Sequence, residues 1–133
     1  MSWDVIMSRT KTNNGAIDEI KSENIILFKQ TEIACEIKKI SARLGAVYNC
    51  DNLSWQNLDC NSWSIEFNVG EDAETESVML LIRGGEPKEV FAMLEADLHT
   101  RLIDCSTGEF ISPDKPTSFA EWKAYRDKIV NGQ

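Results

Sequence analysis

Two neighbouring apolar patterns, residues 63–69 and 77–83, constrain the fold of this chain more than any other feature. In the first pattern apolar and polar residues alternate, which predicts a strand with one buried face. Its apolar positions are Trp63, Ile65, Phe67 and Val69. The second pattern is apolar from Val78 to Ile82, as in a central strand covered on both faces. The short polar stretch between them predicts a turn, so the two strands should form an antiparallel hairpin.

Helical periodicity appears on both sides of this hairpin. Residues 32–44 carry apolar side chains at helical spacing, and Gly45 is suited to end that helix in the left-handed conformation. Residues 87–98 show a second apolar stripe. Residues 2–9 and 101–105 contain short β-forming segments, which predict a first and a last strand.

The resulting order is β-α-β-β-α-β, which matches the split βαβ of ferredoxin-like folds. Right-handed crossovers would place both helices on one face of a four-stranded sheet. We therefore expect one α+β domain over residues 1–133, with an α+β sheet of another strand order as the alternative. Residues 46–61 are polar and are expected to form a loop with one short extended piece.

The C-terminal residues 116–130 predict an additional helix. Ser118 and Glu121 have the spacing of a capping box. Apolar side chains then follow on one side, at Phe119, Trp122, Tyr125 and Ile129. This helix would cover either the sheet edge or its open face.

The net charge of −8 narrows the choice of partners. Such a surface repels nucleic acids and anionic membranes, which favours a basic protein or a small ligand; the alternative is that the charge only keeps the protein soluble. No secretion signal or membrane-spanning run is apparent, so we expect a cytoplasmic protein with reduced cysteines. The four cysteines lack the close pairing of zinc sites, and no metal or cofactor is expected.

The predicted turn carries a run of acidic residues without an intervening lysine or arginine. Counted with the preceding strand, the acidic residues are Glu66, Glu71, Asp72, Glu74 and Glu76. Three interpretations remain open: a solvated turn, a weak divalent-cation site, or a patch that docks on a basic protein. Trp55 lies in polar sequence and is either an exposed binding anchor or a lid over the core.

Three features of the sequence could indicate catalysis. Arg83-Gly84-Gly85 lies between a strand and a helix, as a phosphate cradle does, but the lysine of a P-loop is missing, so a structural turn is favoured. Cys105 could act as a nucleophile only if its pKa were lowered. His99 is the only histidine and lies at a helix end, where a structural role is favoured. No catalytic residue is therefore predicted.

Four short motifs resemble a family of small, uncharacterised bacterial proteins. They are Ser2-Trp3-Asp4, Ser64-Ile65-Glu66-Phe67-Asn68-Val69-Gly70, Arg83-Gly84-Gly85 and Asp104-Cys105-Ser106-Thr107-Gly108-Glu109. The resemblance covers most of residues 2–111 and implies no catalytic residues, because the family has no established activity. In size, charge and lack of catalytic motifs the chain is similar in character to immunity proteins, which neutralise a co-encoded toxin.

These observations lead to three hypotheses about function. The first is a protein-binding module, such as an immunity protein that binds a basic toxin, plausibly a nuclease, through the acidic residues and Trp55. The second is a small enzyme or anion-binding protein that uses Arg83-Gly84-Gly85 and Cys105. The third is a homodimer or other homo-oligomeric module formed through an exposed sheet edge or face.

Overall fold

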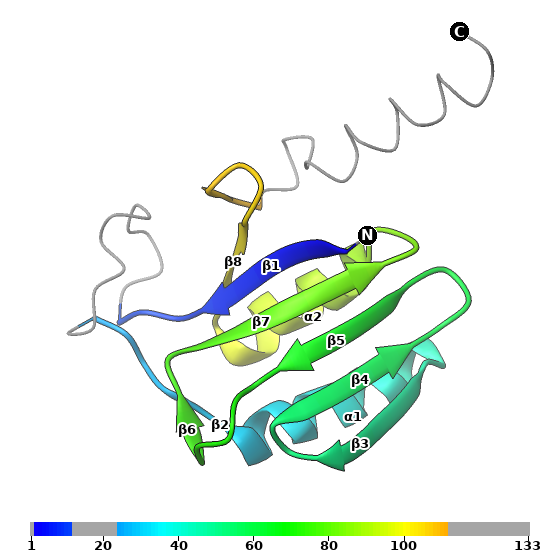
Figure 1. Ribbon diagram of the computed structural model, residues 1–133, viewed down its shortest axis with the longest axis horizontal. Coiled ribbons are helices and arrows are strands. Elements are labelled where there is room, and N and C mark those ends of the chain that lie inside the picture. The colour runs from blue at the N-terminus through cyan, green and yellow to red at the C-terminus, as the bar shows by residue number, and fades with distance from the viewer. Residues whose placement is uncertain (1, 12–23, 112–133) are drawn as a thin grey trace, which may run out of the picture.

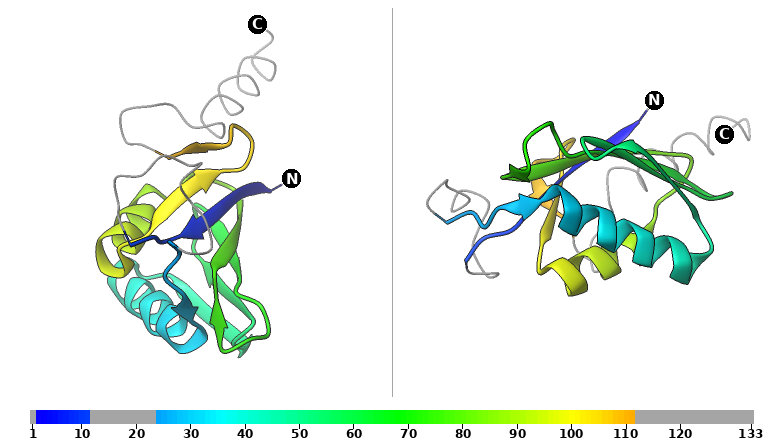
Figure 2. Two further views of the ribbon diagram at one scale, coloured as in Figure 1. Left: turned by 90° about the vertical axis from the view of Figure 1, so that its left-hand side faces the viewer. Right: turned by 90° about the horizontal axis from the view of Figure 1, so that it is seen from below.

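A computed structural model describes residues 2–11 and 24–111. In this part of the chain, seven strands form one sheet and two helices cover one face of it (Figures 1 and 2). The sheet strands are β1 (Trp3–Ser8), β3 (Val47–Asn52), β4 (Trp55–Asp59), β5 (Ser64–Asn68), β7 (Ser77–Arg83), β8 (Arg101–Asp104) and β9 (Glu109–Phe110). The helices are α1 (Gln30–Leu44) and α2 (Lys88–Leu98), and β2 (Phe28–Lys29) pairs with β6 (Glu74–Thr75) in a separate ribbon.

The strands follow the order β3-β4-β5-β7-β1-β8-β9, and each neighbouring pair is antiparallel. The predicted α+β class is confirmed for the described residues, in which both helices lie on one face of the sheet. The four predicted strands correspond to β1, β5, β7 and β8, which lie next to one another in the order β5-β7-β1-β8. The predicted sheet was too small, because β3, β4 and β9 extend it at its two edges.

The predicted antiparallel pairing of the two central strands is confirmed, but the expected cover on both faces of the second strand is not found among the described elements. Strands β5 and β7 pair in a register that places Ile65 opposite Ile82 and Phe67 opposite Leu80, and all four side chains are buried. The intervening β7 residues Met79 and Leu81 are only half-buried and lie on the other face. That face has no described helix over it (Figure 2).

The prediction of a loop over residues 46–61 was wrong. Residues 47–59 form the hairpin of β3 and β4. Its inward face includes Leu58 and the fully buried Gln56, whose side-chain oxygen accepts a hydrogen bond of 2.8 Å from the Tyr48 hydroxyl. A strand of this kind is normally recognised by apolar residues at its inward positions, but here a polar residue, Gln56, takes one of them. The hydrogen bond from Tyr48 on the neighbouring strand satisfies the buried amide, so its burial costs little.

The two helices match the predicted positions closely. Helix α1 begins at Gln30, two residues before the predicted start, and Gly45 ends it with a φ of 70°, in the left-handed region. Helix α2 ends at Leu98, and the next residue, His99, caps it with a left-handed φ of 54°. His99 thus serves as the residue after the last helical turn, in agreement with the structural role expected for it.

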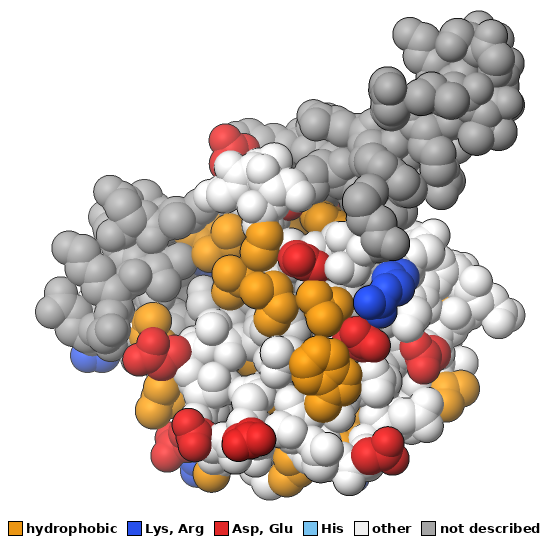
Figure 3. Space-filling view, in the orientation of Figure 1, with side chains coloured by type: hydrophobic (Ala, Val, Ile, Leu, Met, Phe, Trp, Pro, Cys, Tyr) orange, Lys and Arg blue, Asp and Glu red, His pale blue; other side chains and the backbone are white. Residues whose placement is uncertain are grey.

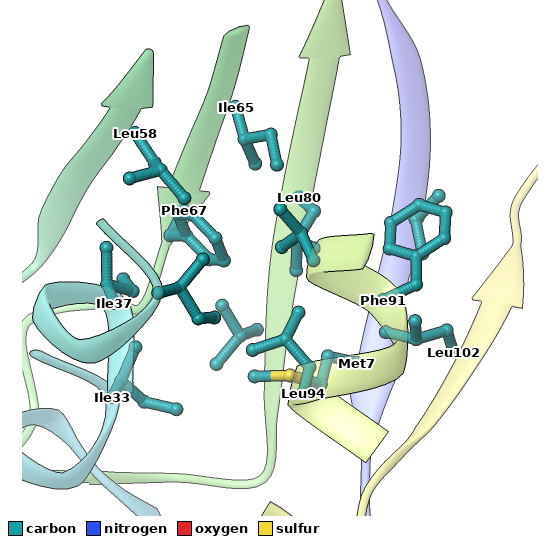
Figure 4. Packing of buried hydrophobic residues seen from close by; sticks show 14 of the residues in the cluster. Met7, Ile33, Ile37, Leu58, Ile65, Phe67, Leu80, Phe91, Leu94 and Leu102 are labelled. Carbon is teal, nitrogen blue, oxygen red and sulfur yellow. The ribbon is translucent and has the colours of Figure 1, made fainter. Parts of the chain in front are cut away.

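The core lies between the helices and the inner face of the sheet (Figure 4). Strand residues Met7, Phe67 and Leu80 meet Ile37 of α1 and Leu94 of α2, and each is at most 1% exposed. Burial of side chains of this size contributes about 1.5–3 kcal/mol each. The predicted C-terminal helix, residues 116–130, lies outside the described residues.

Candidate binding surface

Four of the five predicted acidic residues lie together on the connection between β5 and β7. Glu71, Asp72, Glu74 and Glu76 are all exposed, and we call residues 69–76 the acidic loop. Figure 3 shows acidic side chains gathered at the lower left, where Figure 1 places β2 and β6. Within residues 2–11 and 24–111, no ion pair joins these four carboxylates to a lysine or arginine. Their charge is therefore presented to solvent.

Main-chain contacts hold the acidic loop in place. The backbone N–H of Gln30 donates to the Ala73 carbonyl at 2.9 Å, and the Gln30 side-chain amide donates to the Gly70 carbonyl. Beyond these bonds, the β2–β6 ribbon places Phe28 opposite Thr75. The loop is thereby attached to the first turn of α1, whose dipole favours nearby negative charge.

The β3–β4 turn lies directly against the other side of the acidic loop. The Ser54 carbonyl accepts hydrogen bonds from the backbone N–H groups of Val69 at 2.9 Å and of Gly70 at 3.2 Å. This contact brings Trp55, which is 37% exposed, next to the loop. An exposure of this size is compatible with both expected roles of Trp55, the binding anchor and the lid.

Exposed apolar side chains flank the acidic loop on both sides. Leu53 and Trp55 lie at the β3–β4 turn, while Ile26 and Leu27, 41% and 43% exposed, precede β2 on the opposite side. Solvent-facing apolar groups beside a rigid charged segment are common where proteins bind one another. The sequence alone did not single out Ile26, Leu27 or Leu53, because their exposure depends on the register of β2 and on the β3–β4 turn.

Glu66 lies apart from the other four acidic residues. It projects from the middle of β5 on the face away from the helices, opposite Leu81 of β7. Its carboxylate pairs with the guanidinium of Arg83 at 3.2 Å. Because this pair neutralises its charge, Glu66 adds little to the potential of the acidic loop.

The Arg83-Gly84-Gly85 segment is a close-packed turn. Gly84 has a φ of +88°, and a Cβ on Gly85 would lie 2.4 Å from the Ser62 carbonyl oxygen. The two glycines are therefore needed where the backbone crosses the chain before β5. The guanidinium of Arg83 is engaged in an ion pair with the carboxylate of Glu66.

Cys105 does not have the lowered pKa that nucleophilic chemistry requires. Partial burial raises the pKa of its thiol, and the negative charges of Asp4 and Asp104 raise it further. Protonated thiols are poor nucleophiles. All four cysteines, including Cys105, are free thiols.

A buried carboxyl group that the sequence analysis did not single out lies between the helices. Burial, followed by the hydrogen bond and negative charge of Asp97, raises the pKa of Glu36 to about 7. The hydrogen bond from Glu36 lowers the pKa of Asp97, which also pairs with Lys39 at 3.1 Å. The sequence did contain a signal for this buried carboxyl group. Glu36 lies three residues after Ile33 and four before Ile40, which places it on the apolar side of α1.

Neither metal binding nor membrane insertion is indicated in the described part of the chain. Residues 2–11 and 24–111 contain no cluster of three or more metal-binding side chains. In the same ranges, no helix combines the length and the apolar character needed to cross a bilayer. No protein-family model, curated protein or solved structure matches this chain.

Proposed function

We propose that this protein binds a basic partner protein through the acidic loop and the apolar side chains beside it. The observation that carries the proposal is the exposure of four carboxylates that pair with no lysine or arginine among residues 2–11 and 24–111, on a loop whose backbone is held by α1 and by the β3–β4 turn. A fixed array of like charges attracts a cationic surface over long range and accelerates association. Because the loop is already ordered, binding requires little loss of conformational entropy.

Trp55 and Leu27 would provide the short-range part of the interaction. Each lies beside the acidic loop with more than a third of its surface exposed. Aromatic and apolar side chains that become desolvated at the centre of an interface contribute most of its affinity. The carboxylates would then select and orient the partner, and these side chains would slow its dissociation.

The narrower proposal is that the protein is a bacterial immunity protein of the cytoplasm. Its small size, its net charge of −8 and an acidic binding surface suit the neutralisation of a basic toxin domain, such as a nuclease. A nuclease must carry positive charge to bind its substrate, so an acidic inhibitor can compete for that surface.

We propose binding in preference to catalysis because of the structure around the two candidate catalytic features, the Arg83-Gly84-Gly85 turn and Cys105. The pKa of the Cys105 thiol is raised, and Arg83 is paired with Glu66. These features favour structural roles for the Arg83-Gly84-Gly85 turn and for Cys105.

We further propose that the fold is an extended relative of the ferredoxin-like arrangement. The support is the strand order β5-β7-β1-β8 with both helices on one face. In this view β3 and β4 are an insertion between the first helix and the second strand of the β-α-β-β-α-β unit.

A binding experiment tests the functional proposal. The candidate partner is a basic toxin-like domain, sought among the genes next to this one, and its rate of association with the full chain is measured by stopped-flow fluorescence at several salt concentrations. The double variant Asp72→Asn/Glu76→Gln removes two charges from the acidic loop. We expect this variant to associate about tenfold more slowly than the wild type and to show a weaker dependence on salt.

A second double variant controls for net charge. Glu89→Gln/Glu109→Gln removes two exposed charges from α2 and β9, and it should keep the association rate much closer to that of the wild type. Equal losses in the two double variants would contradict a role for the acidic loop. In cells, expression of the wild type should protect against the toxin domain, and Trp55→Ala should weaken that protection.

A further inference from the structure

A hydrogen bond between two carboxyl groups joins the helices near the end of α2. Glu36 lies in the middle of α1 and Asp97 lies in the last turn of α2, and the two helices run side by side on the same face of the sheet (Figure 2). Their carboxyl groups are hydrogen-bonded to each other. Because an ionised carboxylate has no hydrogen to donate, this bond requires that one of the two groups carries a proton.

The surroundings of the two groups show which one carries the proton. Glu36 is 7% exposed, and its Oε1 finds no hydrogen-bond donor within residues 2–11 and 24–111. An ionised carboxylate that lacks donors is costly to bury, so the neutral form is favoured here. The side chain of Asp97 is 27% exposed and lies 3.1 Å from the ammonium group of Lys39, which stabilises its charged form. Glu36 is therefore the donor and Asp97 the acceptor.

Two cations of α1, Lys39 and Arg43, act on this pair. Lys39 acts on both carboxyl groups, whereas Arg43 acts on Asp97. Asp97 needs this support because a carboxylate in the last turn of a helix lies at the negative end of the helix dipole. The lysine and the proton of Glu36 thus both hold the Asp97 carboxylate against α1.

A neighbouring contact between the same elements does not depend on a shared proton. One turn before Glu36 on α1, Glu32 pairs with Arg9, whose guanidinium also donates to the Leu98 carbonyl at 3.3 Å. Arginine stays protonated in proteins. This contact keeps the end of α2 attached when Glu36 loses its proton, so the response to ionisation should be local and should not unfold the domain.

We propose that Glu36 and Asp97 form a pH-sensitive switch, in which one shared proton holds the last turn of α2 against α1. When the proton leaves, two negative charges face each other and Glu36 is left as a buried carboxylate. The last turn of α2 then opens and admits water to that carboxylate. Burial, followed by the hydrogen bond and charge of Asp97, raises the pKa of Glu36 to about 7. The switch is therefore closed in mildly acidic solution and opens as the pH rises through neutrality.

NMR spectroscopy of the full chain tests this proposal with two signals. The carboxyl carbon of Glu36 reports its ionisation and should titrate with a midpoint of about 7. Hydrogen exchange of the amides of residues 95–98 reports opening of the last turn. Glu36→Gln keeps a donor for Asp97 but cannot ionise, so it is the closed reference. Exchange should be equal in the two proteins in mildly acidic solution and severalfold faster in the wild type above neutral pH. Comparison at the same pH cancels the intrinsic pH dependence of exchange.

Three further variants control for other causes. Glu89→Gln removes an exposed carboxyl group from the first turn of α2 and should exchange like the wild type. His99 follows α2 directly, and histidine side chains change charge near neutral pH. His99→Asn tolerates the left-handed backbone and should leave the response unchanged. Asp97→Asn removes a charge that helps to retain the proton and should lower the midpoint of Glu36.

Several results would overturn the proposal. A midpoint of Glu36 close to its ordinary value of 4.5 would remove the shared proton. Equal exchange of the last turn in wild type and Glu36→Gln at all pH values would show that ionisation opens nothing. Loss of the response in His99→Asn would assign it to the histidine. An equal acceleration in the amides of the central strand β7 would show that ionisation unfolds the whole domain instead of opening one turn.

Discussion

Arg9 and Glu32 form a two-pronged ion pair, in which Nη2 lies 2.8 Å from Oε1 and Nη1 lies 3.0 Å from Oε2. The guanidinium also donates to the carbonyls of Leu27 and Leu98 and lies 4.5 Å from the centre of the Phe28 ring. This one side chain therefore connects the end of β1 to the start of α1 and the end of α2. Burial alone raises the pKa of Glu32, but the hydrogen bonds and charge of Arg9 and Lys29 hold it below its usual value.

We expect Arg9→Lys to destabilise the protein although it keeps the charge. Lysine cannot reproduce the paired hydrogen bonds or the stacking on Phe28. The free energy of unfolding measured with urea should fall by about 1.5–3 kcal/mol, as for hydrogen bonds to charged groups. Lys39→Gln removes the exposed pair with Asp97 and should cost less than about 1 kcal/mol. A similar loss in the two variants would show that Arg9 has no special role.

Stability should depend on pH through Glu36. Its pKa is raised from 4.5 to about 7 in the folded protein, so the folded state holds this proton more tightly than the unfolded state. Stability from this group is therefore greatest below pH 4.5 and decreases as the pH rises towards 7. Glu36→Gln should increase the urea midpoint relative to wild type more at pH 8 than at pH 4.5. The same difference at the two pH values would contradict the assignment.

Gly85→Ala should destabilise the protein through a backbone clash. The added Cβ would lie 2.4 Å from the Ser62 carbonyl oxygen, and neither group can move without shifting the main chain. Overpacking of this kind costs about 1–3 kcal/mol. The comparison is Gly108→Ala, where the φ of +71° is unfavourable but no atom lies within 4 Å. Thermal unfolding should show the larger decrease for Gly85→Ala.

Alkylation of Cys105 should be slow at neutral pH. Partial burial, then the charges of Asp4 and Asp104, raise the pKa of the thiol, so little thiolate is present. The rate of modification by iodoacetamide, followed by peptide mass spectrometry, should rise only in the alkaline range. Asp4→Asn should shift this rise to lower pH. Rapid alkylation of wild-type Cys105 at pH 7 would support the alternative in which this residue is a nucleophile.

The elements with a simple apolar period were predictable from the sequence, and the polar hairpin was not. Strands β5 and β7 and both helices carry clear apolar spacing. In β3 and β4, by contrast, the inward Gln56 is tolerated only because Tyr48 donates a hydrogen bond to it from the partner strand. That pairing is a tertiary contact, and the local sequence contains no sign of it.

Because the β3–β4 hairpin was not predicted, the prediction of the binding surface was also incomplete. The acidic residues of the loop were recognisable because they lie close together along the chain. The position of Trp55 beside them depends on the Ser54 carbonyl, which bonds to Val69 and Gly70 only once the β3–β4 turn has formed. Conversely, Glu66 was grouped with the loop by sequence proximity, although its pairing with Arg83 sets it apart.

The way in which the acidic loop is attached has a consequence for how such a protein diversifies. Its conformation depends on backbone groups of Val69, Gly70 and Ala73, while the carboxylates themselves form no ion pair with a lysine or arginine in the described part of the chain. Substitutions at these outward positions can therefore accumulate at little cost in stability. In the binding role proposed above, the specificity of such a loop can therefore change from one variant to the next while the backbone that holds it stays the same.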